Sequence, residues 1–291
     1  MLGLFLLPAL FAVGLVFHLS DDDDEETSTP DPEIVDVPDD VEEFVGSDAD
    51  EVITARDEGG TILARGGDDT VVGSDNIDFI LGDGGDDRIF GGADDDFVSG
   101  GQGDDRVFLG DGDDTSAPFL DDNSVAEGDD FIRGGAGNDL IIDGFGSNTV
   151  FGDLGNDSIS VLDGNAADGS IDPSADFGSA DVASGGQGND EIFGDDGDTL
   201  TGGSGDDEFN IVSDLNREQD NVTITDFNTA EDVLVFRTLR GDEDENSITF
   251  TFDPDRNAVI ASDGDDELAL LQGLTQADIP QIRSNLIVFT G

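Results

Sequence analysis

Aspartates recur at intervals of nine residues through the middle of this sequence, and they are the residues best suited to chemistry. Each stands two positions before an apolar β-forming residue, as Asp69 does before Val71 and Asp87 before Ile89. Carboxylates repeated at a fixed spacing suit a row of hard cations, because such ions prefer oxygen ligands. Calcium is the best match, since it takes about six to eight carboxylate and carbonyl oxygens, whereas magnesium demands a tighter octahedron. The acids therefore predict an array of calcium ligands.

The remaining composition excludes several other kinds of chemistry. The 291 residues include no cysteine and one histidine, His18, so thiolate nucleophiles and the ligands that transition metals prefer are missing. With 72 acidic and ten basic residues the formal charge is −62, which excludes nucleic acid as a partner because phosphate binding needs a basic face. A chain with this charge and this low apolar content does not fold unless something cancels the repulsion.

The glycines around each aspartate predict the elements that position it. Four nine-residue units are complete, namely GGQGDDRVF (100–108), GGAGNDLII (134–142), GGQGNDEIF (185–193) and GGSGDDEFN (202–210). Glycine tolerates positive φ, so the first six residues of a unit can turn tightly with their carbonyls pointing inward. The last three residues are long enough only for a short strand with one inward apolar side chain. Because a single strand cannot bury that side chain, the chain must coil and stack.

These units resemble the calcium-binding nonapeptide repeat of the RTX family, and the resemblance covers more than half of the chain. It implies an all-β fold, namely a right-handed parallel β-roll with two nonapeptides per turn, which a carboxy-terminal β cap would close. It also implies multiple bound Ca²⁺ ions between loops that lie eighteen residues apart. The candidate calcium-binding residues are Gly67, Asp69, Asp78, Gly82, Gly85, Asp87, Asp96, Gly100, Gly103, Asp105, Asp114, Asp130, Gly134, Gly137, Asp139, Gly155, Asp157, Gly185, Gly188, Asp190, Asp198, Gly202, Gly205 and Asp207.

The nine-residue register is not uniform. It runs unbroken up to the segment 109–117, where Ser116 stands in the apolar position, and it resumes after a seven-residue insertion. A second interruption follows, and the unit at 194–201 is then one residue short. Asn148 is an exception among the acids that precede the apolar positions.

The two sides of the expected roll differ in their loops. On one side, the loops that begin at Ala64, Gly82 and Gly100 keep both the glycine of the fourth position and the acid of the sixth. Three loops on the opposite side lack that glycine, and one of them also lacks the acid. The residues in place of the glycine are Glu58, Asn76 and Asp94, and Gly60 replaces the acid. In this first part of the roll, we therefore expect better calcium occupancy on the first side.

Composition divides the chain into four parts. Residues 1–19 carry no formal charge and as a helix would reach about 28 Å, so we expect a membrane anchor rather than a cleaved signal, which usually has a basic start. Residues 20–43 are acidic and contain proline, which predicts a disordered linker. Residues 44–210 are the expected roll, with interruptions near 118–124 and 166–175.

Residues 211–291 lack the nine-residue period and form the fourth part. Alternating apolar stretches at 221–227, 232–236, 247–252, 257–261, 267–271 and 285–290 predict antiparallel strands, with phenylalanines capping the roll. The stretch DNVTITDFNTAEDVLVF (220–236) resembles the segment that follows the repeats in the serralysin carboxy-terminal domain. That resemblance implies a type I export machinery as a partner, and a β cap without any export role is the alternative.

The sequence favours a non-enzymatic function. It contains no H-E-x-x-H motif and no G-x-S-x-G motif with a triad histidine. We predict an extracellular or cell-surface calcium-binding protein whose repeats fold on binding Ca²⁺ after export. One alternative is a structural or adhesive surface protein, in which Leu63, Val72, Leu81 and Phe90 at the ninth repeat position would form an apolar stripe. Another is a non-catalytic relative of secreted β-roll enzymes that act on polysaccharide.

Overall fold

Two long β-sheets make up most of the described structure. A computed structural model describes residues 32–38, 41–118, 128–162, 179–213, 221–238, 248–264 and 266–290. In spatial order, sheet A contains β1 (Glu33–Asp36), β3 (Glu51–Thr54), β5 (Thr70–Val72), β7 (Arg88–Ala93), β9 (Arg106–Asp111), β11 (Phe131–Ala136), β13 (Thr149–Leu154), β15 (Val182–Gln187), β17 (Thr199–Ser204), β19 (Val222–Ile224), β23 (Asp266–Gln272), β22 (Ala258–Asp263) and β21 (Ile248–Asp253). Sheet B contains β2 (Glu43–Val45), β4 (Gly60–Gly66), β6 (Asp78–Gly84), β8 (Phe97–Gln102), β10 (Thr115–Ser116), β12 (Leu140–Ile142), β14 (Ser158–Ser160), β16 (Glu191–Gly194), β18 (Glu208–Ser213), β20 (Val233–Thr238) and β24 (Leu286–Thr290).

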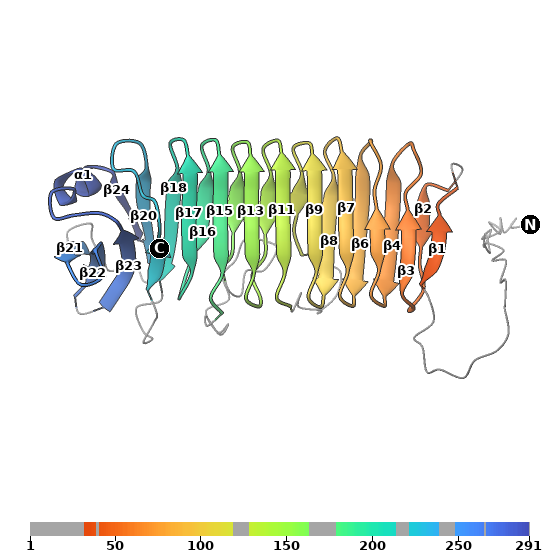
Figure 1. Ribbon diagram of the computed structural model, residues 1–291, viewed down its shortest axis with the longest axis horizontal. Helices are drawn as coiled ribbons and strands as arrows, with labels where there is room; N and C mark the ends of the chain where they lie inside the picture. The colour runs from red at the N-terminus through yellow and green to blue at the C-terminus, as the bar shows by residue number, and fades with distance from the viewer. Residues whose placement is uncertain are drawn as a thin grey trace, which may run out of the picture. The chain divides into compact units, whose positions relative to one another are not determined.

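The chain alternates between the two sheets, so each pair of strands completes one turn of a coil (Figure 1). Neighbouring strands of each sheet run parallel, and in the regular turns residues eighteen apart are partners, as Ile89 and Val107 are in β7 and β9. Parallel pairing requires the chain to cross over between strands. Here the crossover consists of one loop, a strand of the opposite sheet and a second loop. The expected parallel β-roll with two nonapeptides per turn is confirmed.

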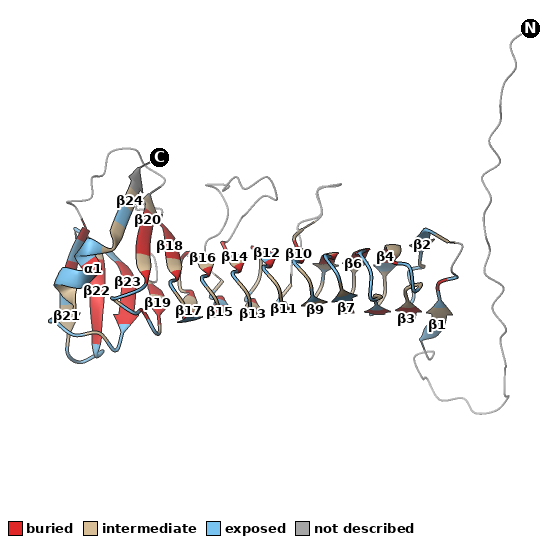
Figure 2. Cartoon of the chain, turned by 90° about the horizontal axis from the view of Figure 1, so that it is seen from above, coloured by how far each residue is buried: buried red, intermediate tan, exposed pale blue. Residues whose placement is uncertain are grey.

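The core is a single file of side chains from each sheet. The apolar residue at the eighth position of each repeat points between the sheets, and Ile53, Ile80, Ile89 and Val98 are fully buried. The residues on either side of it alternate outward, as the two-residue period of a strand requires. Figure 2 shows buried residues alternating with intermediate and exposed ones along the roll, and longer buried stretches in the carboxy-terminal strands β20, β22 and β23. One aliphatic side chain per strand is a small core, so the loops must supply the remaining stabilisation.

The loops form two edges of the roll, which we name by the direction of the chain. Edge 1 holds the loops that run from sheet B to sheet A, and edge 2 holds the loops that run from sheet A to sheet B, at the top of Figure 1. Edge 1 is the side for which we predicted better calcium occupancy. Both interruptions of the register lie on edge 1, because the sheet-A partners Arg106 and Phe131 are 25 residues apart and Thr149 and Val182 are 33 apart. The loop of the short unit at 194–201 also lies on edge 1. The central residues of the two interruptions, 119–127 and 163–178, lie outside the described residues.

The roll begins earlier than the sequence indicated. Residues Glu33–Asp36, within the expected disordered linker, form β1 and pair in parallel with β3. Val37 follows them and is buried in the core. This pairing covers the otherwise open edge of sheet A, which offers unpaired N–H and carbonyl groups to any β-capable segment. The linker boundary at residue 43 was therefore wrong for this segment. Among the described residues no helix could span a bilayer, and the segment 1–19 lies outside them.

The carboxy-terminal part continues both sheets before it caps them. β19 and β20 pair in parallel with β17 and β18, and β24 pairs in parallel with β20. Only β21, β22 and β23 are antiparallel to one another. The expectation of antiparallel strands throughout 211–291 was therefore wrong, because the open ends of both parallel sheets accept the next strand in the existing direction. Phe227, Phe236 and Phe250 are buried in the core here, as the capping role predicted.

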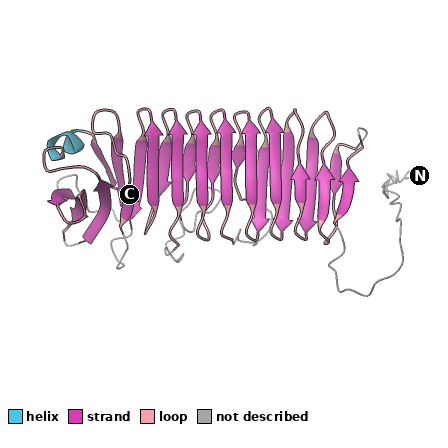
Figure 3. Ribbon diagram, viewed as in Figure 1, coloured by secondary structure: helices cyan, strands magenta, loops and turns pink. Residues whose placement is uncertain are grey.

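A short helix, α1 (Ile279–Ser284), was not expected from the sequence (Figure 3). Pro280 lies in its first turn, where a proline is tolerated because that N–H needs no intrahelical partner. Ile282 is its buried residue and packs into the end of the core. The helix therefore covers the end of the roll before β24 returns to sheet B.

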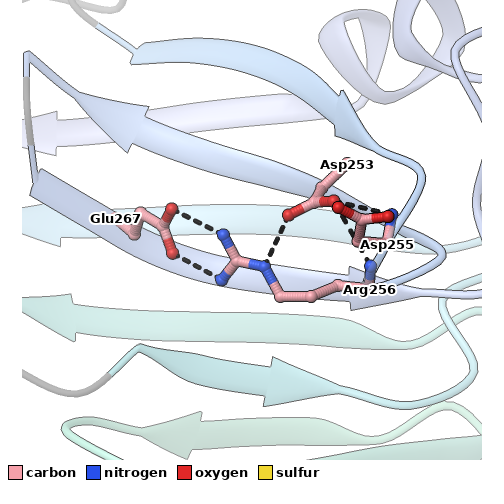
Figure 4. A network of polar contacts seen from close by, with 4 residues as sticks. All are labelled: Asp253, Asp255, Arg256 and Glu267. Carbon is pink, nitrogen blue, oxygen red and sulfur yellow. Dashed lines mark hydrogen bonds and ion pairs between the residues drawn. The ribbon is translucent and has the colours of Figure 1, made fainter.

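An arginine joins two strands of the antiparallel cap (Figure 4). The guanidinium of Arg256 donates two hydrogen bonds to Glu267, at 2.7 and 2.8 Å, and a third to Asp253 at 2.8 Å. Arg256 lies in the turn between β21 and β22, and Glu267 belongs to β23. Bidentate contacts of this kind hold an arginine in one geometry. The network therefore fixes the turn against the neighbouring strand.

The apolar stripe suggested for a surface role does not form. Leu63 and Leu81 belong to β4 and β6, whereas Val72 and Phe90 belong to β5 and β7. The four side chains are therefore divided between the two sheets. The ninth position alternates between sheets because each turn contains two nonapeptides.

Candidate metal centres

The aspartates at the sixth repeat position form a ladder along each edge. On edge 1, the N–H of Asp69 donates to Oδ1 of Asp87 at 2.8 Å, and the N–H of Asp87 donates to Oδ1 of Asp105 at 2.8 Å. The ladder crosses the first insertion without a break, since the N–H of Asp105 donates to Oδ1 of Asp130 at 2.7 Å. Edge 2 repeats the pattern from Gly60, whose N–H donates to Oδ1 of Asp78, as far as Asp232, whose Oδ1 accepts from the N–H of Asp207. Each rung ties a carboxylate to the preceding turn.

Most of these carboxylates have a second oxygen without a hydrogen bond. The Oδ2 atoms concerned are buried and belong to Asp69, Asp87, Asp96, Asp105, Asp114, Asp139, Asp157 and Asp190. A buried carboxylate oxygen that lacks a partner is costly, because its desolvation is not repaid. These oxygens are therefore the atoms at which a cation would do most to stabilise the fold.

Four of the predicted acids lie outside this set. Asp78 accepts at Oδ2 from the N–H and the hydroxyl of Ser74, at 2.7 and 2.9 Å. Asp198 accepts at Oδ2 from the N–H of Asp195 at 2.8 Å. Asp130 has its carboxyl within hydrogen-bonding reach of that of Asp143, and Asp207 accepts at Oδ1 from the N–H of Asp190 at 3.0 Å in the ladder of edge 2. Asp78 and Asp198 thus have less capacity for a metal than the regular acids.

The first-position glycines make room for the second carboxylate oxygen. A Cβ at most of them would overlap Oδ2 of the acid in the same loop, as at Gly82 with Asp87 and at Gly100 with Asp105. The same holds for Gly134, Gly152, Gly185 and Gly202. The glycine and the aspartate of one loop are therefore a matched pair.

The fourth-position glycines allow the turns to stack. Gly155 has φ of +142°, and a Cβ there would overlap the carbonyl oxygen of Gly137 in the preceding turn. Its N–H instead donates to the carbonyl of Gln187 in the following turn at 2.8 Å. The other predicted glycines with positive φ at this position are Gly67, Gly85, Gly103, Gly137, Gly188 and Gly205. Backbone carbonyls consequently line each edge beside the aspartates.

A second ladder, which the sequence analysis missed, comes from the fifth position. On edge 1, Asp86 accepts at Oδ1 from the N–H of Asp104 at 3.0 Å, and Asp104 accepts from that of Asp129 at 2.9 Å. On edge 2, Asn138 and Asn156 accept in the same way. The signal was present, because all four complete units carry aspartate or asparagine at the fifth position. These side chains are exposed, so they tie turns together from the solvent side.

Burial without a counterion changes the acidity of the sixth-position aspartates. Desolvation is the largest cause; nearby acids add to it, and a backbone hydrogen bond opposes it. It raises the pKa of Asp69 and Asp190 to about 6, of Asp87, Asp96 and Asp139 to about 7, and of Asp105 to about 8. The metal-free roll therefore disfavours the charged carboxylates on which it is built.

The donor set fits a hard cation. Each regular loop offers one carboxylate oxygen and several backbone carbonyls, which are ligands that calcium accepts. Within the described ranges no three acidic or histidine side chains converge on one point that could hold a metal. An ion here would therefore draw its ligands from the carboxylates and carbonyls of adjacent loops. The regular sixth-position aspartates are the residues that would hold it.

The regular loops match a known family. The family model for the RTX calcium-binding nonapeptide repeat matches four segments, at residues 63–98, 81–115, 126–159 and 177–209. This chain carries RTX calcium-binding repeats. The RTX match confirms the resemblance found in the nonapeptides, and it ends at residue 209, before the segment that resembles the serralysin carboxy-terminal domain. The calcium-binding character of the RTX repeats agrees with the oxygen donors described above.

One solved structure that resembles the chain is the extracellular lipase LipA from Serratia marcescens. The two sequences are 16% identical, and the TM-score is 0.24. The alignment covers 84% of this chain and 39% of the lipase chain, so the RTX-repeat chain spans well under half the length of that protein. A comparison with curated proteins found no match.

Proposed function

We propose that this is a non-enzymatic calcium-binding protein whose RTX repeats fold into the β-roll when they bind Ca²⁺ outside the cell. The observation that supports this most directly is the set of buried Oδ2 atoms without hydrogen-bond partners along both edges. In the absence of metal, those oxygens oppose folding. With calcium between the loops, the same oxygens become ligands and favour it.

The expected magnitudes agree with metal-driven folding. Extracellular calcium modules bind with Kd of about 10⁻⁴–10⁻³ M. At a tenfold excess of calcium over Kd, one site adds about 1.4 kcal/mol to the free energy of unfolding. A few such sites reach the whole stability margin of an ordinary domain, which is about 5–15 kcal/mol. Sites of this affinity stay empty where calcium is scarce, as in cytosol, so folding would follow export.

The test compares the full chain in calcium and in chelator. Circular dichroism and size-exclusion chromatography should show a compact β-rich protein in millimolar calcium and an expanded chain after chelation. Titration calorimetry in parallel reports calcium binding itself. A chelated sample as compact and heat-resistant as the calcium-loaded one would refute the proposal.

The non-enzymatic part of the proposal rests on the sequence. The chain has one histidine and no cysteine, and its acids are committed to a repeated structural pattern in both edges. Singling out two of them as a catalytic pair would have no geometric basis. Screening the calcium-loaded protein against polysaccharide substrates tests this directly, and turnover of any of them would contradict it.

A role in surface contact is the second candidate, and aromatic rows on the outer faces favour it. Phe79 and Phe97 stack at 4.8 Å on sheet B, and Phe90 and Phe108 stack at 5.1 Å on sheet A. Flat rows of rings on a rigid sheet can contact another surface. Pull-down on cells with and without calcium would test it, and equal retention of a variant lacking the rings would contradict it.

A further inference from the structure

One edge-1 loop reverses the usual arrangement of its residues. In the loop 143–148, Asp143 stands at the first position, where the complete repeats have glycine, and Asn148 stands at the sixth, where they have aspartate. Asn148 still serves the ladder, because its Oδ1 accepts from the N–H of Asp130 at 2.9 Å. Its amide nitrogen contacts the carbonyl of Phe145 at 3.4 Å. The loop has therefore kept the hydrogen bond to the preceding turn and lost the second carboxylate oxygen.

The first position is the place from which that oxygen can be replaced. In the regular loops, Oδ2 of the sixth residue occupies the space that a Cβ at the first position would enter, as with Asp87 and Gly82. An acidic side chain at the first position must therefore extend into the same part of the loop. Asn148 places no carboxylate in this space, and Asp143 supplies one.

The surroundings of Asp143 point to a ligand. Its side chain is 4% exposed, and its Oδ2 has no hydrogen-bond partner. Its carboxyl group is also within hydrogen-bonding reach of the carboxyl of Asp130. Two buried carboxylates so close together repel each other unless they share a proton or a cation.

A small, partly open pocket lies beside these two acids. Its volume is about 20 Å³, and it is lined by Asp105, Asp130 and Asp143 together with Ser99 and Ser116. A cavity needs about 10–15 Å³ to hold one water molecule, so this one has room for a single small ligand. Ser116 stands at an eighth position, where an aliphatic side chain would otherwise fill the core. The pocket thus brings carboxylate and hydroxyl groups beside the apolar side chains of Val107, Ile132 and Ile142.

We propose that Asp143 is a calcium ligand and that it forms, with Asp130, a site for one ion in this pocket. This inference rests on the proposed function, because it assumes that the edge loops bind calcium. The hydroxyl groups of Ser99 and Ser116 and the loop carbonyls are the further oxygen donors at hand. The pair of carboxylates matches the charge of one divalent cation, so the site needs no third carboxylate.

The test counts the calcium ions held by the full-length chain. Wild type and variants are passed through gel filtration in limiting calcium, and the bound metal is measured by elemental analysis and native mass spectrometry. Asp143→Asn keeps the shape of the side chain and removes its charge, so it should hold one ion fewer than wild type. Asp143→Gly should lose the same ion. The double variant Asp143→Gly/Asn148→Asp restores the regular loop and should recover it.

Asp129→Asn is the matched control. Asp129 lies at the exposed fifth position of the neighbouring loop, and its Oδ1 accepts from the N–H of Ser147 at 2.8 Å, a bond that asparagine can keep. This control should hold as many ions as wild type. It separates the loss of a ligand from the loss of one negative charge.

The outcomes separate this inference from the proposed function. If Asp143→Asn holds as many ions as wild type, the two acids share a proton instead, and the inference fails while the proposed function stands. If wild type holds no calcium, both fail. Should the variants not fold, a crystal of the calcium-loaded wild type decides the question. A calcium peak about 2.3–2.6 Å from the carboxylate of Asp143 supports the inference, and filled repeat loops without that peak overturn it.

Discussion

Replacing Asp87 with asparagine should have opposite effects with and without calcium. The side chain is 1% exposed, its Oδ1 accepts from the N–H of Asp69 at 2.8 Å, and its Oδ2 has no partner. Asparagine can keep the hydrogen bond at Oδ1, as Asn148 does naturally. The substitution therefore removes the candidate metal ligand and the buried charge while it leaves the ladder in place.

The size of each effect follows from the structure. Burial raises the pKa of Asp87 from 3.8 to about 7, so keeping this acid in the metal-free roll at pH 7 costs up to about 4 kcal/mol, at about 1.4 kcal/mol per pH unit. Asparagine avoids that cost, so in chelator the variant should favour the roll. In calcium at tenfold excess over Kd, losing one site should cost about 1.4 kcal/mol.

Denaturant unfolding followed by circular dichroism, in calcium and in chelator, measures both effects. The matched control is Asp86→Asn, one residue away, where the side chain is exposed and accepts from the N–H of Asp104 at 3.0 Å. This control should change stability by a few tenths of a kcal/mol at most under both conditions. If Asp87→Asn lowers stability equally with and without calcium, the assignment of Oδ2 as a metal ligand is wrong.

Three further predictions concern the same loops. In chelator, acidification should compact the chain. The raised pKa values of Asp87 and Asp105, about 7 and 8, favour the metal-free roll below about pH 4, and that advantage disappears as the pH rises to 8. A compact fraction by size-exclusion chromatography that increases with pH would contradict this. Gly155→Ala should destabilise the calcium-loaded roll by more than the roughly 1–2 kcal/mol of backbone strain at positive φ, because the new Cβ would overlap a carbonyl oxygen. The control Gly264→Ala, with positive φ and open surroundings, should cost that strain alone. Equal melting temperatures of the two variants would show that the turns can separate. In calcium-soaked crystals, calcium occupancy should be higher on edge 1 over residues 55–105 and higher on edge 2 after residue 134, where edge 2 holds the complete loops. Equal calcium occupancy on both edges would refute this prediction.

The nine-residue repeat predicted most of the architecture. An apolar residue every nine positions, with glycines and an acid before it, allows only short strands separated by tight turns, and such strands are stable only when stacked. The pairing of Ile89 with Val107 and the ladder through Asp69 and Asp87 follow from that repeat. The ladder even crosses the insertion between Asp105 and Asp130, because a loop can lengthen outward without moving the residues at its ends.

Sequence reasoning was less successful where the period ended. The segment at Glu33–Asp36 resembled a linker by composition, and α1 had no periodic pattern long enough to notice. The strands after residue 211 were recognised, but their directions were not, since alternation of apolar residues is the same in parallel and antiparallel strands. What decided these elements was the exposed end of each sheet, which accepts whichever segment can reach it.

The amino-acid sequence alone determined the repeat, the residue types in each loop and the preference for a hard cation, because these depend on local backbone freedom and on the chemistry of carboxylates. Only the tertiary structure showed that most of the sixth-position aspartates use one oxygen to accept a hydrogen bond from the preceding turn and keep the other buried without a partner. It also brought Asp143 beside Asp130, two residues that the sequence separates by two strands and the loop between them. Such contacts arise only when successive turns stack, so no single repeat contains the information that specifies them.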